Sequence, residues 1–379
     1  MRFQNIPGQE KNKSLLSQWV ESEKIPHAMT FHGRQGTPKL ALAHALAQKI
    51  LCSHPVSGDS CGVCNHCKKA SKWIHPDLHT VFPVIKKENK KREDTVSLDF
   101  MDEWRSLYEK HSYFAFQDWT TWIKAENSPP NINTRECIEL AHKLSLQTFE
   151  GKAKVMIIWM PEFLGKEGNR LLKLVEEPTQ DTYIILVTEN LQAILPTIIS
   201  RTQIIHVPPV SDGQIAEFIQ SKLELDIESA RQIALISDGD LGKAISMINS
   251  PVSDHATMLF DWIRVSFKGD AIKLVDFVDG LSKTGRQELK DFLQYGLSFF
   301  REYLLFLQTG QKGVRLNNEE FEIARKMTQV IDIEQCFQLI EVLNEGIIHI
   351  SRNANPKISF MADSIAMGNI LKKEKLIKN

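Results

Sequence analysis

Short apolar runs alternate with helical patterns over the first 208 residues of the chain. The runs are apolar throughout, which is typical of strands that helices cover on both faces. We predict strands at Met29–His32, His79–Phe82, Val155–Met160, Tyr183–Thr188 and Ile204–Val207. Apolar positions three or four residues apart predict helices between these strands, including Lys39–Leu51, Arg135–Leu146 and Asn169–Val175. This order predicts a parallel α/β sheet in residues 1–208.

The pattern changes after Pro208-Pro209. Short helical patterns from Asp212 to Ile248 predict a small helical lid, which we place at residues 209–250. From residue 251 to residue 379, wide apolar stripes predict amphipathic helices at His255–Phe267, Ala271–Leu281, Gln287–Leu307, Glu319–Val330, Ile333–Ile350 and Ile358–Leu371. So much apolar helical surface predicts an all-α bundle that packs against other subunits.

The composition adds limits to this picture. The chain has 379 residues, 42% hydrophobic and 25% charged, with a formal net charge of -1. These values are typical of a soluble globular protein, and the near-neutral charge means that any basic surface must be local. No apolar run reaches the roughly 20 residues of a membrane span, and the first residues lack the apolar region of a signal peptide. We therefore expect a soluble, cytoplasmic protein with no membrane partner.

The segment that follows the first predicted strand has the spacing of a phosphate-binding loop, G-x-x-x-x-G-K-[ST]. Such a loop needs a backbone N–H before its lysine to face the phosphates and a hydroxyl after it to bind magnesium. Here Pro38 has no N–H and Leu40 has no oxygen. We predict a degenerate phosphate loop that keeps only Gly33, Gly36 and Lys39.

Two further expectations concern the start of the helix after this loop. Thr37 followed by Pro38 is typical of an N-cap residue and a first helical position. Lys39 alone could support weak anion binding, but we expect a surface lysine that holds no ligand.

Four of the six cysteines fall close together, in the pattern C-x8-C-x2-C-x2-C. In a reducing compartment such a cluster indicates a metal site, and the alternative is a set of ordinary buried thiols. Four thiolates form a closed tetrahedral zinc site, which has no open position for catalysis. We predict a structural zinc ion bound by Cys52, Cys61, Cys64 and Cys67. His66 lies within the cluster, but the cysteines fill the shell, so we expect it to be a bystander.

Residues 85–130 fit neither the sheet pattern nor the bundle pattern. This insertion opens with basic residues between Lys86 and Arg92 and then carries the aromatic residues Trp104, Tyr108, Tyr113, Phe114, Phe116, Trp119 and Trp122. Basic residues with aromatic ones could bind single-stranded nucleic acid by charge and stacking. We favour a solvated charged loop followed by a small helix that packs Phe100, Trp104 and Leu107 inward.

Several motifs recur together in one known family. They are the loop frame, the cysteine cluster, Pro26-His27-Ala28, His75-Pro76-Asp77, the run from Asn169 to Pro178, and the run from Leu195 to Arg201. With these motifs the chain resembles the delta-prime subunits of bacterial DNA polymerase III clamp loaders, in the AAA+ superfamily. The resemblance covers residues 1–84 and 131–250, and the C-terminal region by pattern only. It implies an AAA+ α/β core with a zinc module, a helical lid and a C-terminal helical collar, whereas the insertion is foreign to the family.

The resemblance also implies losses from a nucleotide pocket. Motor subunits of the family carry an Asp-Glu pair at the end of the third strand, for magnesium and for the attacking water. In this chain Trp159 and Met160 occupy those positions. A phosphate-sensing arginine would stand near Gly242, where this chain has glycine followed by Lys243. Since the loop has changed as well, we do not expect this chain to hydrolyse ATP.

One motif of the family's chemistry remains. Ser200-Arg201-Thr202 matches its Ser-Arg-Cys motif, with threonine in place of cysteine. In the family this arginine reaches the γ-phosphate of ATP held by a neighbouring subunit, where its planar cation stabilises the transferring phosphoryl group. The resemblance therefore implies that Arg201 is a catalytic residue that acts in trans. The alternative is an arginine that interacts with a helix dipole.

The function that the resemblance implies is a non-hydrolysing stator subunit of the replicative clamp loader, within the DNA polymerase III holoenzyme. Its partners would be motor subunits of the gamma/tau type and delta-type subunits. Through the complex it would act on the sliding clamp and primer-template DNA. Two alternatives stay open: an ATP-hydrolysing motor subunit of the same family, and a zinc-bearing protein that binds single-stranded nucleic acid through the insertion.

Overall fold

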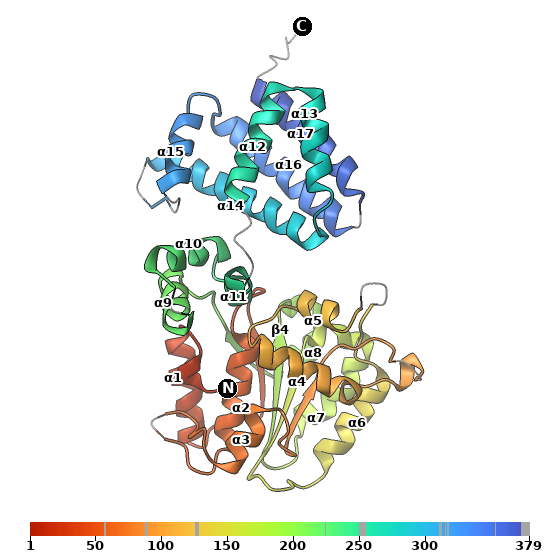
Figure 1. The fold of residues 1–379 in the computed structure, drawn as a ribbon. Helices are drawn as coiled ribbons and strands as arrows, with labels where there is room; N and C mark the ends of the chain where they lie inside the picture. The colour runs from red at the N-terminus through yellow and green to blue at the C-terminus, as the bar shows by residue number, and fades with distance from the viewer. Residues whose placement is uncertain are drawn as a thin grey trace. The chain divides into compact units, whose positions relative to one another are not determined.

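The computed structural model describes residues 1–56, 58–87, 90–125, 129–223, 225–249, 255–310, 313–314, 316, 318–352 and 354–372. The chain divides into two compact units, residues 1–246 and residues 247–379 (Figure 1). The first unit holds the sheet, and the described part of the second is helical. Parts of the predicted insertion, the end of the predicted lid and parts of the C-terminal region lie outside the described residues.

The sheet consists of five parallel strands in the order β2-β3-β4-β1-β5. The strands are β1 (Ala28–His32), β2 (Leu78–Val81), β3 (Lys154–Trp159), β4 (Thr182–Thr188) and β5 (Gln203–His206). The central strands β3 and β4 are buried almost throughout, as expected for strands with helices on both faces. The predicted strands are confirmed, with each end shifted by no more than one residue.

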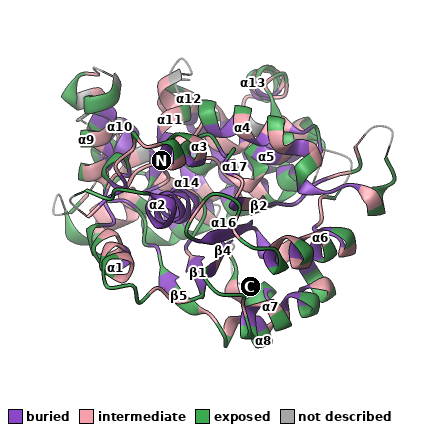
Figure 2. Cartoon of the chain, turned by 90° about the horizontal axis from the view of Figure 1, so that it is seen from below, coloured by how far each residue is buried: buried purple, intermediate pink, exposed green. Residues whose placement is uncertain are grey.

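Helices cover both faces of this sheet. On one face α2 (Lys39–Leu51) is buried along its whole length, and α1 (Glu10–Glu21) packs beside it (Figure 2). The other face is covered by α6 (Thr134–Ser145), η4 (Pro161–Leu171), α7 (Leu172–Glu176) and α8 (Pro196–Ile199). Along β3, Ile157 and Trp159 pack on the α2 side, whereas Ile158 packs on the other side. The predicted α/β arrangement is therefore confirmed.

Smaller elements connect these layers. Near the N-terminus and the cysteine cluster they are η1 (Phe3–Asn5) and α3 (Asn65–Ser71), and before α8 lies η5 (Leu191–Ala193). After the sheet come α9 (Asp212–Leu223), α10 (Ile227–Ser237) and α11 (Leu241–Asn249), which we call the lid. Residues of the lid up to 246 belong to the same compact unit as the sheet, and the boundary that we placed at residue 208 stays a prediction.

The insertion folds into η2 (Arg92–Asp94), η3 (Ser97–Phe100), α4 (Met101–Lys110) and α5 (Phe116–Trp122). Phe100, Trp104 and Leu107 are all buried, so the favoured prediction of an inward-packing helix is confirmed. Trp119 is also buried, and its indole N–H donates a hydrogen bond to the carbonyl of Pro83. The aromatic residues of the insertion thus join the core on the α2 side of the sheet.

The second unit is a helical bundle with its own apolar core. Its helices are α12 (His255–Lys268), α13 (Ala271–Leu281), α14 (Arg286–Thr309), α15 (Asn318–Met327), α16 (Ile333–Ser351) and α17 (Pro356–Lys372). The long helix α14 packs on α16, and α17 packs on α12, α13 and α16. The predicted helices are confirmed, with ends shifted by at most three residues. No helix in the described part of the chain combines the length and the apolar character that crossing a bilayer requires.

Candidate functional site

Lys39 is the first residue of α2 and is buried, with 4% of its surface exposed. Its ammonium group lies 3.1 Å from Oε1 of Glu189 and donates a hydrogen bond to the carbonyl of Arg34. Burial lowers the pKa of Lys39, and the negative charges of Glu189, Glu162 and Asp240 oppose that change. The prediction that Lys39 lies at the surface is wrong. Its partner lies 150 residues away along the chain, and no local pattern could pair the two.

The loop before α2 forms a turn of its own. The Thr37 hydroxyl donates a hydrogen bond to the carbonyl of Arg34 and does not cap the helix, whose N-cap position is Pro38. The expected Thr37 cap is therefore wrong. Gly36 has a φ of 77°, in the left-handed region that glycine adopts readily. The frame of a phosphate loop is kept, while the N–H that would precede the lysine is absent.

Lid residues lie directly against this loop. The Leu241 N–H donates a hydrogen bond to the carbonyl of Gly36, with a distance of 3.1 Å between nitrogen and oxygen. A Cβ added to Gly36 would lie 2.0 Å from the carboxyl carbon of Asp240. Arg34 forms an ion pair with Asp238, with Nη1 and Oδ2 3.0 Å apart. Carboxylates of the chain itself therefore lie against this loop.

Trp159 and Met160, at the end of β3, offer a cation no side-chain oxygen. Trp159 and Met160 are both buried, and neither side chain has an oxygen atom. Glu162 lies nearby, and its Oε1 accepts hydrogen bonds from the Thr188 hydroxyl and the Glu189 N–H. The sequence reasoning missed Glu162 and Glu189. The available signal for Glu189 was its position just after β4, at the sheet edge where parallel strands place site residues.

Arg201 lies in a different environment from Lys39. It follows α8, its side chain is 40% exposed, and its Nε lies 2.6 Å from Oε1 of Glu176. Its Nη1 also donates a hydrogen bond to the Thr197 carbonyl near the end of α8. An exposed ion pair contributes at most about 1 kcal/mol, so another anion can displace Glu176. Thr202, in place of the family's cysteine, bonds through its hydroxyl to that of Thr30 on β1.

The direction of the strands separates Arg201 from the chain's own phosphate loop. The loop follows β1 at the carboxyl edge of the sheet, whereas Arg201 precedes β5 at the amino edge. Since β1 and β5 are parallel neighbours, the two sites lie at opposite edges, about 15 Å apart for a five-residue strand. Arg201 therefore lies away from the phosphate loop of its own chain.

The four predicted cysteine ligands come together after α2. Their sulfur atoms all lie within 4.8 Å of one another, and Sγ of Cys61 is 3.8 Å from Sγ of Cys67. A tetrahedral site with zinc–sulfur bonds of about 2.3 Å places its sulfurs about 3.8 Å apart. Backbone N–H groups of the cluster also donate to sulfur, as from Cys61 to Cys52 and from Cys67 to Cys64. The residues form a possible metal site whose chemistry fits zinc.

His66 has a partner outside this cluster. Its Nδ1 lies 2.9 Å from Nε2 of His75, and Glu150 lies close to both rings. The Asp77 N–H donates to Nδ1 of His75, so the proton of a neutral ring sits on Nε2. The Lys69 ammonium lies 2.6 Å from the Glu150 carboxylate. The proton on Nε2 of His75 and the nearby Lys69 ammonium both disfavour a metal ion between His66, His75 and Glu150. The histidine pair instead connects the cysteine module to Glu150.

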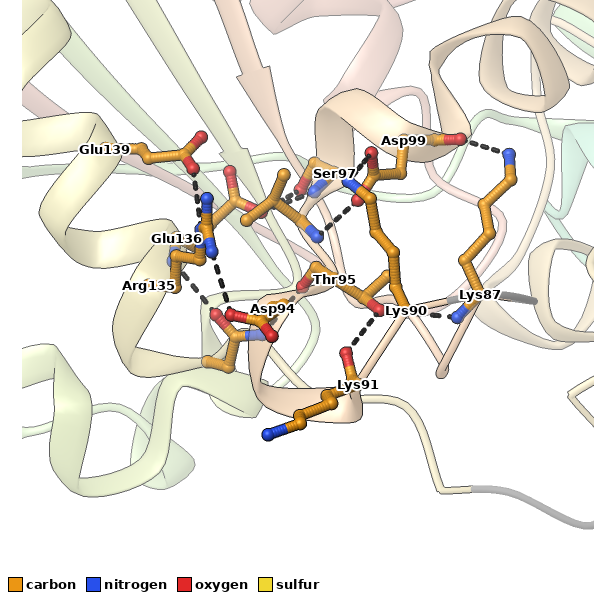
Figure 3. Close-up of polar contacts among 12 residues, drawn as sticks. Lys87, Lys90, Lys91, Asp94, Thr95, Ser97, Asp99, Arg135, Glu136 and Glu139 are labelled. Atoms are coloured by element: carbon orange, nitrogen blue, oxygen red, sulfur yellow. Dashed lines mark hydrogen bonds and ion pairs between the residues drawn. The ribbon is translucent and has the colours of Figure 1, made fainter.

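Two of the basic residues that open the insertion, Lys87 and Lys90, form ion pairs with acids of the insertion. Lys87 lies 3.0 Å from Glu103. Lys90 lies 2.6 Å from Asp99 (Figure 3). In the same network Arg135 of α6 pairs with Asp94. The large aromatic side chains Trp104, Tyr108 and Trp119 are buried. Buried rings cannot stack on bases, so these three residues do not support the single-strand binding alternative.

Comparisons with known proteins agree with the resemblance. The sequence model of the family described as DNA polymerase III, delta subunit, matches residues 8–211. The DNA polymerase III subunit tau of Bacillus subtilis is 22% identical over 395 residues, which cover 95% of this chain and 60% of that protein. The DNA polymerase III subunit delta' of Bacillus subtilis is 28% identical over 210 residues, 55% of this chain and 50% of that protein. The chain thus spans about half to three fifths of these relatives.

Among solved structures, the Bacillus subtilis DNA clamp loader delta protein aligns over 95% of this chain and all of that chain. The sequence identity is 11% and the TM-score is 0.32. Independently of that alignment, the parallel sheet followed by helices agrees with the AAA+ fold that the resemblance implies.

Proposed function

Because the chain belongs to the family described as DNA polymerase III, delta subunit, we propose that it is a clamp-loader subunit that does not itself hydrolyse ATP. In this proposal it acts as a stator, joined to gamma/tau-type motor subunits and to delta-type subunits. It supplies Arg201 to ATP held by a neighbouring motor subunit. The assembled complex then loads the sliding clamp onto primer-template DNA.

The observation that carries the proposal is the contrast between the two edges of the sheet. At the carboxyl edge, Lys39 is buried and paired with Glu189, and Trp159 stands where a magnesium-binding carboxylate would be needed. At the amino edge, Arg201 is exposed and held by a weak ion pair. These features support the proposal, because the first edge lacks side chains that hydrolysis requires and the second carries an exposed cation.

The chemistry proposed for Arg201 follows from its side chain. A guanidinium is planar, always charged at neutral pH and able to donate two parallel hydrogen bonds to phosphate oxygens. During phosphoryl transfer, negative charge spreads over the γ-phosphate oxygens, and an arginine supplied in trans contributes roughly 10³-fold or more to turnover. Glu176 would hold the guanidinium until the phosphate of the neighbour replaces that carboxylate.

The cysteine cluster has a structural part in this proposal. Cys52, Cys61, Cys64 and Cys67 would hold one zinc ion with no open coordination position, so the ion would stabilise the fold of the module. No step of the reaction passes through it.

The motor-subunit alternative is the main competitor, since a tau subunit is among the relatives. It requires a magnesium site that Leu40, Trp159 and Met160 cannot form. The stator hypothesis and the motor-subunit hypothesis predict different ATPase activities for the isolated chain. A silent isolated chain agrees with the proposal, and motor-like turnover by the chain alone would overturn it.

The experiment that tests the trans role is ATP turnover by a reconstituted complex, stimulated by primed DNA and clamp. We expect Arg201→Ala to abolish the share of turnover that comes from the site next to this subunit. The matched control is Arg264→Ala, which removes another exposed arginine that is paired with an acid, Asp261. Unchanged turnover in a complex that still assembles would show that Arg201 is structural.

A further inference from the structure

The end of β3 is packed with aromatic rings from the insertion. The Trp159 ring lies 5.3 Å from that of Trp104, 5.4 Å from Phe114 and 6.0 Å from Phe116, measured between ring centroids. Phe116 also stacks on Phe163, just after β3. A magnesium ion keeps several bound waters and prefers oxygen ligands, so it has no place in such an apolar cluster. The insertion therefore occupies the environment of the missing acidic pair.

The loop between α4 and α5, residues 111–115, continues from this cluster to the lid. The Tyr113 ring packs edge-on against Phe218 of α9, with ring centroids 6.0 Å apart. The Tyr113 carbonyl lies so close to α11 that a Cβ added to Gly242 would be 2.4 Å from its oxygen. Any side chain at position 242 would push this loop away. The Tyr113 hydroxyl also donates a hydrogen bond to the carbonyl of Asn5.

The insertion also contacts the sheet side. The Tyr108 hydroxyl forms a hydrogen bond with Nδ1 of His44 on α2, at 2.9 Å. Trp104 stacks on Phe82 just after β2, with centroids 4.2 Å apart and nearly parallel rings. Residues 104–116 of the insertion thus contact α2, the end of β3, α9 and α11. The end of β3 and α11 carry Trp159 and Gly242, two of the positions where the resemblance implies losses from a nucleotide pocket.

Two of the three changes in the pocket lie in direct contact with the insertion. Trp159 supplies the ring on which the insertion packs, and Gly242 supplies the space that the Tyr113 carbonyl needs. The third change, at the phosphate loop, accompanies contacts of Arg34 and Gly36 with the lid. The altered pocket residues and the insertion are therefore parts of one packing arrangement.

We propose that the insertion takes the place of a nucleotide between sheet and lid, with residues 111–115 as the joining segment. The lid is then attached to the sheet without ATP, and its attachment does not change when ATP is present. This inference concerns the chain's own fold, and it holds whether or not Arg201 acts on a neighbour. It assigns a role to the segment for which the resemblance implies none.

Hydrogen exchange of the isolated full chain, followed by mass spectrometry, tests this proposal. In the wild type we expect the amides of α9 and α11 to exchange at the same rate with and without magnesium-ATP. In Tyr113→Ala we expect these amides to exchange at least tenfold faster, while those of β1 and β3 keep their protection. Trp122→Ala is the matched control, because Trp122 belongs to the same insertion and packs against the core.

Two results would overturn the proposal. One is a lid whose exchange slows severalfold on addition of magnesium-ATP to the wild type. The other is a Tyr113→Ala chain whose lid exchanges as slowly as in the wild type. If Tyr113→Ala loses protection throughout the sheet, Phe218→Ala removes the same ring contact from the lid side and must give the expected local effect. Neither measurement involves Arg201, so the trans role can fail or hold separately.

Discussion

At the scale of single residues, the ion pair of Lys39 with Glu189 neutralises the one lysine of the phosphate-loop frame. A lysine in a phosphate loop attracts a ligand only while its charge is unpaired. Lys39 is buried next to the Glu189 carboxylate, so a phosphate would have to displace a carboxylate that is already in place. Removing one partner of such a pair leaves a buried charge, which costs several kcal/mol for a fully buried pair.

Glu189→Gln tests this pairing. We expect the free energy of unfolding of the first unit to fall by about 2 kcal/mol, less than for a fully buried pair because Glu189 is 26% exposed. Sulfate should restore part of the loss, since it can supply the missing negative charge to Lys39. Urea denaturation with and without sulfate measures both effects. Glu10→Gln, which removes the exposed partner of Lys13, is the control.

An unchanged stability in Glu189→Gln would contradict the account of Lys39. Restoration by sulfate in the Glu10→Gln control would show that the salt acts on the whole protein and not on the loop.

At the scale of elements, one buried acid joins the insertion to α6. Glu136 is 2% exposed, and its carboxylate accepts hydrogen bonds from the N–H and the hydroxyl of Ser97, before α4 (Figure 3). Burial raises the pKa of Glu136 to about 7. The folded chain therefore holds a proton that the unfolded chain releases near pH 4.5. Between pH 4.5 and about pH 7 the unfolded state binds fewer protons than the folded state, so the free energy of unfolding falls as the pH rises.

The expected result is a loss of stability between pH 5 and pH 8, approaching about 3 kcal/mol for this group. Glu136→Gln cannot ionise and should show a flatter dependence. Urea denaturation across this pH range, followed by tryptophan fluorescence, provides the comparison. Glu139→Gln, on the same helix and paired with Arg135, should behave like the wild type. Parallel pH profiles for wild type and Glu136→Gln would rule out this assignment.

The cysteine module gives a second test at this scale. We expect about one zinc ion per chain by elemental analysis, and its loss in Cys64→Ser. His66→Ala should keep the zinc, because His66 contacts His75 and not the cysteine sulfurs. Loss of zinc in His66→Ala with an intact fold would make that histidine a ligand. If the wild-type chain retains no zinc, the alternative interpretation, a set of ordinary buried thiols, is supported instead.

Most elements could be predicted from the sequence because their signals are local. Parallel strands buried on both faces leave continuous apolar runs, and a metal cluster leaves closely spaced cysteines. The inward-facing Trp104 could also be predicted from helical spacing. The packing of that ring on Trp159 and of Tyr113 on Phe218 could not, because each joins segments far apart in the chain. The pairing of Lys39 with Glu189 also joins distant segments, and the sequence alone predicted that Lys39 lies at the surface.

At the scale of the whole molecule, the account rests on two separate edges of one sheet. At the carboxyl edge Lys39 is buried and paired with Glu189, and at the amino edge Arg201 is partly exposed. In the proposed function, such a subunit contributes to a reaction whose nucleotide a neighbouring subunit holds. The helical second unit, with its own core, fits the collar that we propose to join the other subunits.

The most direct test of this central claim is trapping of magnesium-ADP by aluminium fluoride on the reconstituted complex. This adduct imitates the transferring phosphoryl group, so it is retained where an arginine completes the transition-state site. We predict that Arg201→Ala loses the adduct from the site beside this subunit, while binding of ADP alone is unchanged. Equal retention of the adduct by wild-type and Arg201→Ala complexes would contradict the account.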